Sequence, residues 1–193
     1  MRLFLVVLIS VNLSYGQESS NRAKSYYDSA LLYANKLKDY ESAIVFCNKA
    51  ISQDSTNTRL YQSLIRYQMI QRKYADAYKT SEKIIQYTEY NAVAYFMSGL
   101  ILEKMGDSLS AFSRYSEAEE KFRLRQAATP ISDMHYEFVV LNRSMNLIFL
   151  RKENMAREVC VEYYEKYKKL VSKDWLDRVS KYDRAYYEHI FFN

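Results

Sequence analysis

The stretch that decides the fold is residues 58–91, TRLYQSLIRYQMIQRKYADAYKTSEKIIQYTEYN, and it is followed directly by residues 92–125, AVAYFMSGLILEKMGDSLSAFSRYSEAEEKFRLR. The two segments align without a gap, and residues 24–57 precede them as a third unit of 34 residues. The columns that recur at this spacing are Tyr27, Tyr61 and Tyr95; Ala43, Ala77 and Ala111; and Cys47, Ser81 and Tyr115. Such a period is the signature of stacked structural repeats.

Each unit contains two apolar-periodic stretches of about 13 residues separated by a short polar break, such as Gln71-Arg72-Lys73. This pattern predicts two helices joined by a turn in every unit. The whole chain has three glycines and one proline, whereas hairpins and barrels depend on turn residues of these kinds. The sequence therefore predicts an all-α fold.

The repeats resemble the tetratricopeptide repeat family. Its large aromatic at the fourth position matches the tyrosine column, and its small residue in the second helix matches the alanine column. Its small–glycine pair is present at Ser98-Gly99 and is replaced by Ala30-Leu31 and Leu64-Ile65, while its unit-ending proline is missing throughout. The resemblance implies a right-handed solenoid of antiparallel helix pairs.

The register of the repeat breaks after residue 125. Arg125–Ser132, which contains Pro130, is predicted to be an insertion. A helix over Asp133–Leu150, opened by Ser132 and Asp133 as capping residues, and a second over Met155–Val171 indicate a degenerate fourth unit near 137–170, offset by about eleven residues. Apolar residues spaced by three and four over 174–192 predict one last helix that caps the solenoid, which makes nine helices.

Residues 1–16 have the three parts of a secretory signal peptide: a basic start at Arg2, an apolar run, and small residues at Ser14 and Gly16. The apolar run of about 11 residues is shorter than the 18 or more that a membrane span needs. We expect cleavage after Gly16, no stable membrane insertion, and an exported protein in the periplasm or outside the cell. An uncleaved short anchor is the alternative. The mature chain, 17–193, is predicted to be one repeat domain.

The sequence offers few residues for catalysis, so we expect no enzyme, no catalytic residue, no cofactor and no metal site. The two histidines, His135 and His189, lack a metal-ligand spacing, and no glycine-rich phosphate loop is present. Cys47 and Cys160 occupy the same repeat column in different units, which predicts two buried free thiols. The formal net charge of +5 is spread along the chain, which argues against nucleic-acid binding.

By analogy with the family, the first helices of the units line a concave groove that binds a protein or peptide. The candidate groove residues are Asp28, Lys36, Arg59, Gln62, Arg66, Met69, Phe96, Leu100 and Glu103. Asp28 and Leu32 stand where one subclass of the family holds the Lys and Asn of a carboxylate clamp, so that clamp is absent. The alternative for Phe96 and Leu100 is that they pack against the helix that follows the insertion.

These observations predict an exported, non-enzymatic scaffold or adaptor. An inhibitor or immunity protein dedicated to one exported enzyme or toxin fits the same features. A third reading is a carbohydrate-binding module, because the late tyrosines and phenylalanines cannot all face one core and some, such as Tyr164 and Tyr187, are expected on the surface. The sequence does not identify the partner or the oligomeric state.

Overall fold

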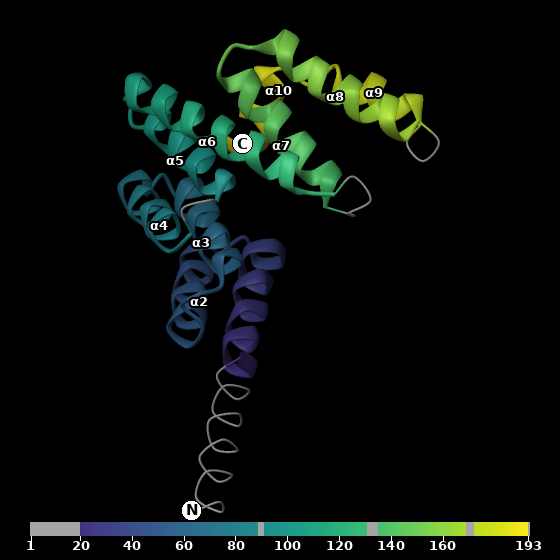
Figure 1. Ribbon diagram of the computed structural model, residues 1–193. Helices are drawn as coiled ribbons and strands as arrows, with labels where there is room; N and C mark the ends of the chain where they lie inside the picture. The colour runs from purple at the N-terminus through teal and green to yellow at the C-terminus, as the bar shows by residue number, and fades with distance from the viewer. Residues whose placement is uncertain (1–19, 89–90, 131–134, 169–171, 193) are drawn as a thin grey trace, which may run out of the picture. The chain divides into compact units, whose positions relative to one another are not determined.

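The computed structural model describes residues 20–88, 91–130, 135–168 and 172–192, and this part of the chain contains helices and no strand (Figure 1). The predicted all-α fold is confirmed. The first helix covers residues 20–32 and continues into a π-helical turn, η1 (Tyr33–Leu37). The later helices are α2 (Tyr40–Gln53), α3 (Thr58–Ile70), α4 (Tyr74–Tyr87), α5 (Ala92–Lys104), α6 (Ser108–Ala128), α7 (Tyr136–Phe149), α8 (Glu153–Tyr167), α9 (Lys173–Val179) and α10 (Arg184–Phe192).

Helices that follow one another along the chain pack as adjacent pairs, including α2 with α3, α5 with α6, and α7 with α8. The repeat columns are the residues that these pairs bury. The fully or nearly fully buried members are Ala43, Ala77, Ala111, Cys47, Ser81, Tyr115, Ala50, Ile84 and Ala118. Because a small side chain lets two helices approach closely, the alanine column marks the crossing points. This arrangement is consistent with a helical repeat.

The turns between paired helices repeat as well. Lys38, Arg72 and Gly106 all have positive φ, at 56°, 57° and 86°, and they are 34 residues apart. A residue in this left-handed conformation commonly ends a helix. Arg151 has φ 56° and follows Gly106 by 45 residues, which is one repeat plus eleven. This spacing equals the offset predicted for the fourth unit, which itself stays a prediction.

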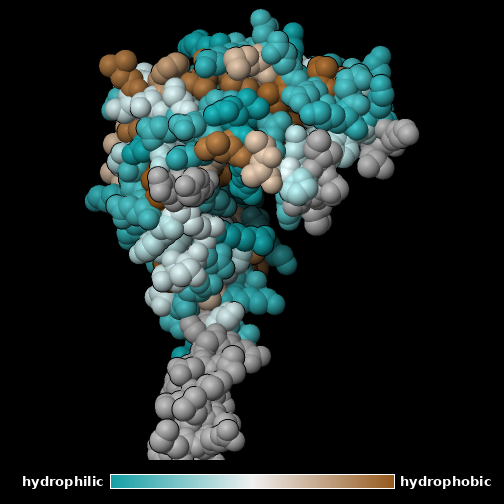
Figure 2. All heavy atoms as spheres, viewed as in Figure 1, coloured by the Kyte–Doolittle hydropathy of each residue, from teal (hydrophilic) through white to brown (hydrophobic). Residues whose placement is uncertain are grey.

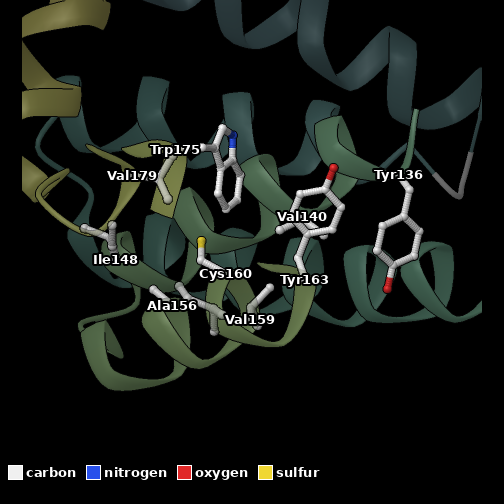
Figure 3. Packing of buried hydrophobic residues seen from close by; sticks show 10 residues of the cluster. Tyr136, Val140, Ile148, Ala156, Val159, Cys160, Tyr163, Trp175 and Val179 are labelled. Atoms are coloured by element: carbon white, nitrogen blue, oxygen red, sulfur yellow. The ribbon is translucent and has the colours of Figure 1, made fainter. Parts of the chain in front are cut away.

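The chain divides into two compact units, the first ending at Thr80 and the second beginning at Ser81. Unit 1 buries an apolar cluster between η1, α2 and α3, which includes Ala34, Cys47 and Leu64. Unit 2 buries a second cluster around Val140, Cys160 and Trp175, shown in Figure 3. A single domain over 17–193 stays a prediction.

The C-terminal part differs from the sequence-based expectation. Two helices, α9 and α10, lie where one capping helix over 174–192 was predicted, so the described residues contain ten helices and not nine. The break falls at Ser180–Asp183, where the Asp183 carboxylate accepts a hydrogen bond from the Tyr186 N–H (2.8 Å) and starts a new helix. In addition, α6 runs on to Ala128 and takes up half of the predicted insertion.

Two further predictions concern residues outside the described ranges. The signal peptide at 1–16 lies there, as do the capping residues Ser132 and Asp133. Among the helices that the structure describes, none has the length and apolar character needed to cross a bilayer.

Candidate functional site

The predicted groove residues of unit 1 lie on two neighbouring helices, the first helix and α3. Tyr27 of the first helix joins them, since its hydroxyl hydrogen-bonds the Ser63 hydroxyl (2.9 Å) and its ring lies 5.9 Å from the Arg59 guanidinium. Arg59, Gln62 and Arg66 follow one another at spacings of three and four, so they share one face of α3. We call the exposed side chains of these two helices around Tyr27 the unit 1 face.

The unit 1 face is mainly cationic. Lys24, Arg59 and Arg66 are exposed, and among the described residues none of the three side chains forms an ion pair with a carboxylate. The Arg59 guanidinium lies over the Tyr27 ring. Asp28 is also exposed and lies in an open hollow of about 420 Å³, lined by Asn21, Lys24, Ser25, Asp28, Ser29 and Leu32. Gln62 is half-buried, and Lys36 is exposed in the π-helical turn. Exposed cations of this kind favour an acidic ligand.

The three apolar groove candidates are buried. Met69 lies in the core of unit 1, while Phe96 and Leu100 are each only 2% exposed in unit 2. The Phe96 ring packs edge-on against Phe149 of α7 (ring centroids 5.4 Å apart) and lies 5.7 Å from the Tyr115 ring. The contact with Phe149 favours, for Phe96, the alternative of packing against the helix after the insertion. Leu100 is buried as well.

Glu103, the last groove candidate, belongs to a network of charges within unit 2. One of its carboxylate oxygens accepts a hydrogen bond from the Tyr115 hydroxyl (2.8 Å), and the other forms an ion pair with Arg184 of α10. Arg184 also pairs with Glu188 (2.7 Å) and lies over the Phe149 ring at 4.8 Å. Burial and the nearby Glu103 carboxylate raise the pKa of Tyr115, so its phenol stays protonated and donates. Both carboxylate oxygens of Glu103 therefore already have partners within unit 2.

A cavity of about 370 Å³ lies in unit 2, between α7, α8, α9 and the turn that precedes α10. We call it the α7–α9 cavity. Its lining residues are Ser144, Ile148, Glu153, Ala156, Arg157, Cys160, Val179, Ser180, Lys181, Tyr182 and Asp183. The sequence did not predict this cavity, because the apolar spacing over 174–192 indicated one continuous helix. Asp183, a residue type that favours helix starts, was the available sign of the break.

Both cysteines are free and buried, as predicted. Burial raises the pKa of the Cys47 thiol to about 12 and also raises the pKa of Cys160, while a side-chain hydrogen bond with Ser144 lowers the latter. Both thiols are therefore protonated near neutral pH. Within the described ranges, no three His, Cys, Asp or Glu side chains gather in a way that could hold a metal ion.

The late tyrosines belong mostly to the core of unit 2. Tyr164 and Tyr187 are half-buried and pack against its apolar cluster. Tyr186 is more exposed, and its ring stacks on that of Tyr182 (centroids 4.1 Å apart, planes 1° apart). Figure 2 shows hydrophilic side chains over most of the visible face, with hydrophobic ones in small groups. No protein-family model matches the chain, and no curated protein is significantly similar to it.

Proposed function

We propose that this protein is an exported, non-enzymatic adaptor of the tetratricopeptide type that binds an acidic segment of a partner protein on the unit 1 face. The single observation that carries the proposal is the pair of exposed arginines, Arg59 and Arg66, on a face that the repeat resemblance assigns to the groove; neither has a carboxylate partner in the part of the chain that the structure describes. Arginines without an internal ion-pair partner are available for a carboxylate of the ligand.

The repeat architecture supports this role. In a repeat protein of this type, one helix pair cannot bury its apolar stripe alone. Successive repeats therefore stack and present the first helix of each pair on one side. The recurring left-handed turns at Lys38, Arg72 and Gly106 and the buried alanine column support that arrangement. A right-handed solenoid, secretion by way of residues 1–16, and a location in the periplasm or outside the cell are parts of the same proposal.

The test is site-specific photo-crosslinking in the cells that make the protein. A photoreactive amino acid is placed at Arg66 in one variant and at Lys79, an exposed lysine of α4, in a matched control. We expect one or a few proteins to crosslink at position 66 and not at 79, and mass spectrometry identifies the peptide. Equal crosslinking at both positions would show that the unit 1 face is not the binding surface.

Charge reversal then measures the contribution of the arginine. In fluorescence anisotropy with the captured peptide, Arg66→Glu should weaken binding by about tenfold or more, since it replaces an attractive charge by a repulsive one. Lys79→Glu makes the same change in net charge and should leave the affinity within about twofold. A single partner bound tightly at equal stoichiometry would favour the dedicated inhibitor over the adaptor.

A further inference from the structure

We propose that the α7–α9 cavity binds a small zwitterion with an apolar side chain, a molecule of about the size of a dipeptide. The volume of about 370 Å³ lies in the range of small-molecule sites. All lining residues belong to unit 2, whereas the adaptor function proposed above uses unit 1. The inference therefore goes beyond that function and stands or fails separately from it.

The inner wall of the cavity is apolar and uncharged. Ile148, Ala156 and Val179 are buried there, and Cys160 is 2% exposed. Figure 3 shows the Cys160 side chain pointing from α8 toward Trp175, with Ile148 and Val179 on the same side of the cluster. Because burial raises the pKa of Cys160, the thiol is neutral and adds no charge to this wall. Such a wall favours an aliphatic side chain, whose transfer from water is favourable.

The charged residues of the cavity are exposed and carry both signs. Arg157 and Lys181 are cations, and across the described residues the side chain of neither forms a hydrogen bond or ion pair. Glu153 has no such partner there either, whereas one oxygen of Asp183 is used to cap α10. Two cations and two carboxylates give the lining a formal charge of zero.

This combination of charges selects the class of ligand. A carboxylate on the ligand pairs with Arg157 or Lys181, and an ammonium pairs with Glu153 or the free oxygen of Asp183. A ligand that bears only a carboxylate would desolvate Glu153 without pairing it, and one that bears only an amine would do the same to Arg157. A zwitterion with an aliphatic side chain satisfies both charges and the apolar wall.

Isothermal titration calorimetry on the full chain tests the proposal, with the dipeptide leucyl-leucine as the probe. Hexanoate and hexylamine serve as single-charge probes of similar apolar character. We expect saturable, equimolar binding of leucyl-leucine and at least tenfold weaker binding of the other two. No saturable binding of leucyl-leucine, or equal binding of hexanoate, would overturn the proposal.

Matched variants locate the binding. Arg157→Ala and Glu153→Gln should each weaken leucyl-leucine binding by about tenfold, the loss expected for one charge-assisted hydrogen bond. Arg178→Ala and Glu158→Gln change exposed residues of α9 and α8 that do not line the cavity, and they should leave the affinity unchanged. An equal loss in the control variants would place the dipeptide elsewhere.

Cys160 provides an independent readout. The small neutral reagent methyl methanethiosulfonate should modify Cys160 through the cavity, and saturating leucyl-leucine should slow that reaction several-fold without changing the rate at Cys47, which lies in unit 1. Mass spectrometry of peptides separates the two thiols. A Cys160 that stays unmodified without the dipeptide, or reacts at the same rate with it, contradicts the proposal.

Discussion

At the scale of single residues, Gly99 of α5 packs closely against Tyr115 of α6. A Cβ atom added there would lie 2.5 Å from Cε1 and 2.6 Å from Cδ1 of the Tyr115 ring in α6. Atoms this close must move apart, and Tyr115 is held by Glu103 and by its aromatic neighbours. Gly106 is favoured for another reason. It has φ +86° and nothing near the position of a Cβ, so the constraint at this residue is in the backbone.

A double-mutant cycle separates these two mechanisms. Gly99→Ala should lower the free energy of unfolding by about 1–3 kcal/mol through overpacking, and Gly106→Ala by about 1 kcal/mol through backbone strain. In a Tyr115→Leu background the cost of Gly99→Ala should shrink, while that of Gly106→Ala should not change. Urea unfolding of the five variants measures this, and equal costs in both backgrounds would refute the ring clash at Gly99.

At the scale of helices, side-chain caps recur with the repeat. Asp39 accepts a hydrogen bond from the Ser42 N–H and Asp107 from the Ser110 N–H, both at 3.0 Å, at the starts of α2 and α6. Asn57 and Asn91, 34 residues apart, cap α3 and α5 in a similar way. The caps use N–H groups that the first helical turn cannot pair, so each sets where its helix begins.

The cap at Asp107 predicts a pH dependence. Hydrogen bonds from the Ser110 side chain and backbone lower the pKa of Asp107 below its ordinary value of 3.8. The stabilisation is therefore present above pH 3.8 and is lost as the pH falls through the lower pKa of the folded protein. Wild type should unfold at a higher urea concentration than Asp107→Asn at pH 7, with the difference disappearing toward pH 3. A difference between the two proteins that stays the same from pH 7 to pH 3 would contradict this origin of the stabilisation.

At the scale of the whole molecule, most helix contacts join neighbours along the chain, and α10 adds longer-range contacts within unit 2. It packs against α7, and its Arg184 reaches Glu103 of α5, 81 residues away. Figure 1 shows α10 passing behind α7. The two side chains are each about a quarter exposed, at 25% and 23%, so the pair is partly desolvated and more stabilising than a fully exposed one.

The strength of this long-range link can be measured. Arg184→Ala and Glu103→Gln should each lower the free energy of unfolding by about 1–2 kcal/mol, and the double variant by about 1 kcal/mol less than the sum. Hydrogen exchange of the α10 amides should be faster in both single variants. Removing the exposed pair Lys168–Glu165 should change neither observable, and additive single effects would contradict the coupling.

The sequence alone was sufficient to predict the all-α class, the helix pairs and the buried columns. This was possible because a 34-residue period puts chemically similar residues at the same contact in each repeat. The spacing of Ala43, Ala77 and Ala111 therefore predicts that they are buried, and no contact between distant segments has to be known. The boundaries predicted beyond residue 125 were less accurate, because α6 continues through part of the predicted insertion.

Only the tertiary structure decided which polar and apolar groups stay available for binding. Phe96 is buried because Phe149 packs against it, and Glu103 is occupied because α10 brings Arg184 to it. The α7–α9 cavity also depends on segments distant in sequence, because residues of α7, α8 and α9 line it together. The period of the repeat specifies contacts between adjacent helices. The burial of Phe96 and the pairing of Glu103 depend instead on side chains that are distant in sequence, and the repeat pattern does not predict which of them meet.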